Sequence, residues 1–139
     1  MSSPSRPEEI QAARDSLSRC VKNPAFLDRF YQLFVDSSEE IRKKFEKTDF
    51  ARQKRVLQDS LFLMLVSAGT SGGPAHAELA KLAERHSRDQ LGIKPEWYDV
   101  WLRCLLQAVA EQDPEYRPEL ATAWRESLEE GIAFLASRY

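Results

Sequence analysis

Apolar side chains recur every three or four residues along each long segment of this sequence, which is the period of an α-helix with one buried face. The chain has 139 residues and only 5 glycines, and no long segment alternates apolar and polar residues as a half-buried strand does. The sequence therefore predicts an all-α fold. Its length suffices for one sizeable hydrophobic core, so we expect a single domain over residues 1–139.

Caps and turn residues divide the chain into helical segments. Ser37 and Glu40 have the spacing of a capping box at the start of a short helix, and Thr48 or Asp49 can cap the longer helix that follows. A glycine-rich stretch at 69–74 predicts a loop. The expected helices are 7–21, one opened by 23–24, a short one after 36–38, 50–68, one that carries 79–86 and ends near 92, one that begins near 95, and 119–138.

Two polar residues lie on stripes that are otherwise apolar. The segment 50–68 is apolar around much of its circumference, which indicates the middle of the domain, and Gln53 is the polar residue at the outer end of its stripe. His86 follows Leu79 and Leu82 at helical spacing, so its imidazole points where the leucines point. Burying this ring without a partner costs ~1–3 kcal/mol. It is therefore either a core histidine satisfied by a backbone carbonyl or a ligand for something that the core encloses.

Composition and charge exclude several classes of partner. The 20 basic and 22 acidic residues are interspersed and leave a net charge of -2, so no basic face is available for nucleic acid or an anionic membrane. The longest apolar run, 61–66, is too short to span a bilayer, and the N-terminus lacks the apolar segment of a signal peptide. Cys20 and Cys104 lack the spacing of a metal or redox motif. We expect a cytoplasmic protein with reduced cysteines.

Common catalytic motifs are absent from the sequence, which contains no GxSxG, Walker loop, GxGxxG or HExxH. It has only two histidines, and His76 is expected on the surface, so a zinc site made of protein ligands alone is not favoured. What remains is an inward His86 together with inward Gln53, Tyr31 and Phe45. An all-α domain with one inward imidazole suits a flat apolar cofactor whose metal needs one axial nitrogen.

In these residues the chain resembles a bacterial globin, and most of all the globin domains of flavohaemoglobins and the sensor globins. The resemblance is carried by the run from Asn23-Pro24 through Phe30-Tyr31 to Phe45, by Gln53-Lys54-Arg55-Val56-Leu57, and by His86 followed by Ile93-Lys94-Pro95-Glu96-Trp97-Tyr98. It extends over nearly the whole chain. It implies a globin-like bundle of about six to eight helices around a haem b pocket.

The resemblance also implies a role for each matching residue. His86 is the proximal ligand of the haem iron, Tyr31 and Gln53 are the distal polar residues, and Leu57 is their apolar neighbour. The other residues implied to contact the cofactor are Phe45, which wedges the ring, Ile93 and Tyr98 on the proximal side, and Arg85 at a propionate.

One element of the family pattern has no clear counterpart in the sequence. Flavohaemoglobins have a late-helix glutamate that joins the proximal histidine and tyrosine, and here only Glu129 and Glu130 are candidates. The segment between His86 and Ile93 is also slightly longer than in that family. Without the glutamate, the histidine would push less electron density toward a bound ligand.

The function expected from the resemblance is reversible binding of dioxygen, or of another diatomic gas, as in oxygen transport. Two alternatives stay open. One is a nitric oxide dioxygenase or peroxidase-like enzyme that takes electrons from an external reductase, because no reductase follows in this chain. The other is a gas-sensing module, or a protein-interaction module without haem. The sequence predicts either a monomer or a homodimer.

Overall fold

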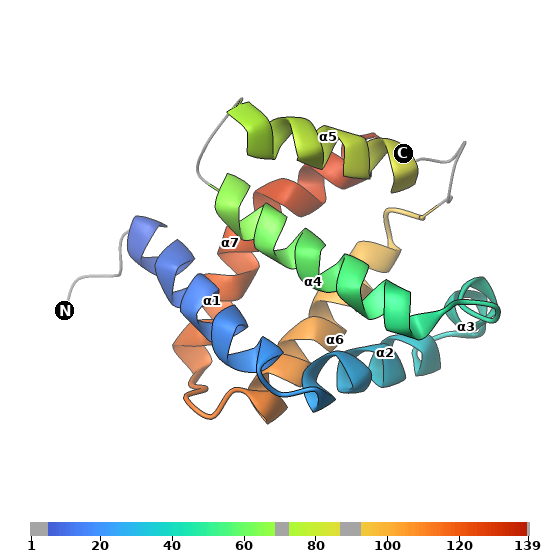
Figure 1. The fold of residues 1–139 in the computed structure, drawn as a ribbon, viewed down its shortest axis with the longest axis horizontal. Helices are drawn as coiled ribbons and strands as arrows, with labels where there is room; N and C mark the ends of the chain where they lie inside the picture. The colour runs from blue at the N-terminus through green and yellow to red at the C-terminus, as the bar shows by residue number, and fades with distance from the viewer. Residues whose placement is uncertain (1–5, 69–72, 87–92, 139) are drawn as a thin grey trace.

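The computed structural model describes residues 6–68, 73–86 and 93–138, which form seven helices and no strand (Figure 1). The prediction of an all-α fold is confirmed. The helices are α1 (Arg6–Val21), α2 (Ala25–Asp36), α3 (Glu39–Lys44), α4 (Phe50–Ser67), α5 (Gly73–His86), α6 (Trp97–Gln112) and α7 (Pro118–Ser137). The expected exit of the fifth helix near residue 92 lies outside the described residues, as does the side chain of His76.

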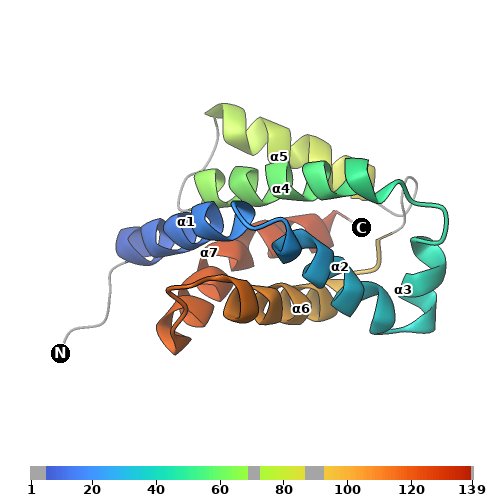
Figure 2. The ribbon, with the colours of Figure 1, turned by 60° about the horizontal axis from the view of Figure 1, so that its bottom comes forward.

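The helices cross one another in layers. In Figure 2, α4 and α5 lie together on one side of the molecule and α6 lies on the other, with α3 at the end where α4 begins. The main helix partners are α1 with α7, α2 with α6, and α4 with α5. Since α4 also contacts α1 and α7, it occupies the central position that its broad apolar face predicts.

The short helix α3 begins one residue later than its capping signal predicts. The hydroxyl of Ser38, not that of Ser37, accepts the amide hydrogen of Ile41 at 3.1 Å. Ser38 has an extended backbone (φ -160°, ψ 153°), which is the usual conformation of an N-cap, whereas Ser37 continues α2 in a helical conformation and donates its hydroxyl to the Phe34 carbonyl. Asp49 caps α4, as one of the two expected alternatives.

A polar cluster made of Ser16, Arg19, Asp113 and Trp124, buried except for part of Arg19, joins α1, the end of α6 and α7. The Asp113 carboxylate accepts hydrogen bonds from the Ser16 hydroxyl at 2.6 Å and from the Arg19 guanidinium at 2.8 and 3.0 Å. The indole of Trp124 in turn donates to the Ser16 hydroxyl at 2.9 Å. Because each buried polar group here has a partner, the cluster avoids the penalty of an unsatisfied buried charge.

Cys20 and Cys104 are free and buried, and burial raises the pKa of both thiols, so neither forms a reactive thiolate. Among the described residues, no helix combines the length and apolarity needed to cross a membrane.

Candidate functional site

A hollow of about 1030 Å³, a volume that includes space open to solvent, lies among α2, α4, α5, α6 and α7, and Lys44 of α3 also lines it. Most of its wall is apolar, and several of the rings that form it are in contact. Phe34 and Phe45 meet edge to face at 5.7 Å between ring centroids, and Phe30 meets Trp101 in the same way at 6.1 Å. An aromatic wall of this size can enclose a flat apolar molecule.

The hollow brings together most of the residues that the sequence singled out. Those that line it are Tyr31, Phe45, Gln53, Leu57, His86, Ile93 and Tyr98. Arg85 is different, because it is exposed on α5 and is not part of the lining. Its expected contact with an acidic group of the cofactor stays a prediction.

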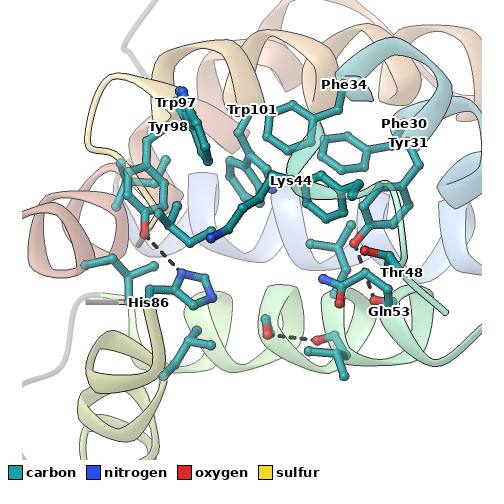
Figure 3. A pocket seen from close by; sticks show the side chains of 18 of the residues that line it. Phe30, Tyr31, Phe34, Lys44, Thr48, Gln53, His86, Trp97, Tyr98 and Trp101 are labelled. Carbon is teal, nitrogen blue, oxygen red and sulfur yellow. Dashed lines mark hydrogen bonds between the residues drawn. The ribbon is translucent and has the colours of Figure 1, made fainter. Parts of the chain in front are cut away.

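His86, the last residue of α5, turns its imidazole into this hollow (Figure 3). Its Nδ1 is hydrogen-bonded to the hydroxyl of Tyr98 on α6, with 3.0 Å between the two atoms. Its backbone carbonyl also accepts the Ile93 amide hydrogen at 3.1 Å, which ties the start of the following segment to the end of α5. The ring is thus held through Nδ1, and Nε2 is the nitrogen left to bind a ligand.

The electrostatic setting keeps both rings of this pair uncharged at neutral pH. Burial, together with the positive charge of Arg85, lowers the pKa of His86 to about 4. Burial raises the pKa of the Tyr98 phenol to about 12. A neutral imidazole has a free lone pair, which is the form that binds a metal ion.

On the opposite side of the hollow, Tyr31 of α2 places its phenol beside the start of α4. Its hydroxyl donates to the backbone carbonyl of Gln53 at 3.4 Å, a distance longer than that of a strong O–H···O bond. Burial raises the pKa of the phenol to about 12, although the bond to Gln53 opposes the shift. Phe30 and Phe50 meet the Tyr31 ring edge to face at 4.9 and 5.4 Å. The ring is therefore fixed, while its hydroxyl is only weakly engaged.

Several other residues line the hollow that were not predicted as site residues from the sequence. They are Phe30, Phe34, Lys44, Thr48, Val56, Ser60, Met64, Leu82, Trp97, Trp101, Ile132 and Leu135. Many of the apolar ones lie on stripes whose period predicts burial, but periodicity does not separate a residue that packs in the core from one that lines a cavity. Lys44 had no such signal, because a lysine in the last turn of a helix is usually solvated.

The two glutamates considered as partners for His86 and Tyr98 do not line the hollow. Glu129 and Glu130 are both exposed, and the Glu130 carboxylate accepts a hydrogen bond from Arg6 at 3.0 Å. Among the described residues, the polar side chain bonded to the His86 imidazole is therefore a phenol, not a carboxylate.

Comparison with known proteins decides the family. The sequence model of the family described as Globin matches residues 28–135, which is well over half of the chain. The chain is a globin. Its backbone matches the crystal structure of protein PA3967 from Pseudomonas aeruginosa PAO1, which is described as structurally highly homologous to a human hemoglobin. That match has a TM-score of 0.88 and 39% sequence identity, and it covers 94% of this chain and 98% of the other.

These findings confirm the predicted resemblance to a bacterial single-domain globin. No curated protein sequence matches this globin. Globins are haem proteins, and the donor set fits that cofactor, because one neutral imidazole with a free Nε2 faces an apolar hollow with aromatic walls.

Proposed function

We propose that this globin binds dioxygen reversibly at a haem b whose iron is held by His86. The observation that carries the proposal is the state of the His86 ring: it is neutral, its Nδ1 is bonded to Tyr98, and its Nε2 is available in the hollow. When bound, haem supplies a ferrous iron that takes a diatomic gas, and dioxygen bound in this way carries partial negative charge.

The distal residues of the hollow suit a partly charged ligand. To donate to a bound ligand, the Tyr31 hydroxyl would have to break only its long hydrogen bond to the Gln53 carbonyl. Gln53 also lines the hollow. A donor in this apolar setting stabilises negative charge more than it would in water. Leu57 and Phe45 exclude water from the same region, because both line the hollow with apolar surface.

The proximal pair favours reversible binding over oxidative catalysis. If Nε2 held the iron, Nδ1 of His86 would keep its proton and donate a hydrogen bond to the Tyr98 oxygen. A neutral phenol pulls on that proton far less than a carboxylate does, so the imidazole keeps its neutral character. This supports a gas carrier over a peroxidase-like enzyme, and we infer a role in cytoplasmic oxygen transport.

The test is the absorption spectrum of the haem-reconstituted protein in its ferric, ferrous and oxygenated forms. We expect a strong Soret band and a ferrous spectrum that shifts with dioxygen and returns when the gas is removed. His86→Ala should lose the histidine-ligated spectrum and regain it with added imidazole. His76→Ala, which removes the other histidine of the chain, is the matched control and should keep that spectrum.

A colourless protein after reconstitution, or unchanged ligation in His86→Ala, would contradict the proposal. The same preparation distinguishes the enzymatic alternative. Rapid consumption of nitric oxide, sustained by an added reductase and far above that of a myoglobin control, would favour a dioxygenase over a carrier.

A further inference from the structure

Lys44 places a positive charge in a hollow whose other described lining residues include no lysine, arginine, aspartate or glutamate. Figure 3 shows its side chain reaching from α3 into the hollow, with the amine directed toward the side that carries His86 and Tyr98. The residue is also exposed, so it lies where the hollow opens to solvent.

Two other cations near this end of the hollow have carboxylate partners from the protein. Arg42, on the same short helix, lies 3.4 Å from Asp36, and Lys94 forms an ion pair with Glu40. Lys44 forms no ion pair within the part of the chain that the structure describes. Its positive charge is therefore available to an anionic group on whatever occupies the hollow.

We infer that Lys44 binds a carboxylate of the ligand in this hollow, and that this carboxylate is a propionate of the porphyrin. The inference rests on the proposed function. An amphipathic ligand of this kind leaves its apolar body against the aromatic wall and its acidic group at the opening, where Lys44 lies. Lys44, and not only Arg85, is then the cation that recognises the acidic edge of the cofactor.

The size of the effect follows from the exposure of Lys44. Water reaches the amine, so the pair with a propionate is a partly solvated, charge-assisted contact and not a buried ion pair. Such contacts change dissociation more than association. We expect loss of the charge to speed haem dissociation by roughly 1.5- to 5-fold at low ionic strength, and by less at high salt.

The experiment measures the rate at which the ferric protein transfers haem to an excess of a haem-free acceptor. Wild type, Lys44→Met, Lys44→Arg and the control Lys43→Met are each loaded with haemin or with its dimethyl ester. Lys43 is exposed on the same helix and does not line the hollow. Lys44→Met should release haemin faster than wild type, while Lys44→Arg and Lys43→Met should stay near the wild-type rate. With the ester, which lacks the carboxylates, all four proteins should release at one rate.

Equal haemin release by Lys44→Met and Lys43→Met would overturn the inference, and so would an effect of Lys44→Met that persists with the ester. Either result leaves the proposed function intact, provided that the wild type shows the spectrum of a histidine-ligated haem. Absence of that spectrum in the wild type would instead refute the proposed function, and this inference with it.

Discussion

Replacing Tyr31 by Phe should speed the dissociation of dioxygen far more than that of carbon monoxide. The change deletes one hydroxyl and keeps the ring, so the edge-to-face contacts with Phe30 and Phe50 are retained and the hollow keeps its shape. The variant therefore tests the donor alone. Carbon monoxide acquires less negative charge than dioxygen and depends less on that donor.

The expected magnitude follows from what the Tyr31 hydroxyl does without a ligand. A hydrogen bond to a charged acceptor contributes about 1.5–3 kcal/mol. To make it, the hydroxyl gives up its bond to the Gln53 carbonyl, which at 3.4 Å contributes about 0.5 kcal/mol. The net contribution is therefore about 1–2.5 kcal/mol, which corresponds to about 5- to 60-fold in the dissociation rate.

Stopped-flow displacement of each gas from the ferrous protein measures these rates. Tyr116→Phe is the matched control, because that phenol is exposed and lies outside the hollow. We expect the control to match the wild type for both gases. Equal acceleration of the two gases in Tyr31→Phe, or no acceleration of either, would refute the reasoning about charge.

Two further predictions concern other hydrogen bonds of the structure. Tyr98→Phe should weaken haem retention by about 10- to 100-fold, because it leaves Nδ1 of His86 without its partner; an unchanged haem-transfer rate and iron–histidine stretching frequency would contradict this. Asp113→Asn should lower the free energy of unfolding by about 2–3 kcal/mol at neutral pH, measured by urea denaturation, because Arg19 loses its buried counter-charge. Burial tends to raise the pKa of Asp113, but hydrogen bonds from Arg19 and Ser16 outweigh it and lower the pKa. The ionised carboxylate therefore stabilises the fold fully above the pKa of the unfolded state, near pH 4, and this stabilisation is lost as the pH falls through the lower pKa of the folded state. The wild type should therefore lose stability over that acidic range more steeply than the variant, and parallel curves would contradict the assignment.

The parts of the fold that were predicted correctly depend on local periodicity. The position of His86 on an apolar stripe is visible in the sequence because the stripe repeats around it, and the structure places its ring in the hollow. The start of α3 was predicted one residue early, since Ser37 and Ser38 are both capping residues and only the backbone conformation distinguishes them.

Charged residues near the site were harder to place from the sequence. The resemblance suggested Arg85, which directly precedes His86, as a cation at a propionate; it is exposed and outside the lining, and that contact stays a prediction. Lys44 looks like an ordinary solvated residue at a helix end, and it lines the hollow because α3 packs against α2 at the end of the molecule where α4 begins. Such a placement depends on how helices meet, which a single-sequence pattern does not encode.

The polar cluster around Asp113 and the wall formed by Trp97, Tyr98 and Trp101 belong to opposite ends of α6. The C-terminal end of α6 is joined to α1 and α7 by hydrogen bonds between side chains of the protein, whereas its N-terminal end lines the hollow. Substitutions at the N-terminal end of α6 can therefore change the affinity for a ligand while the hydrogen bonds at its C-terminal end are kept. Ligand preference can therefore change during evolution while the packing of α1, α6 and α7 is retained.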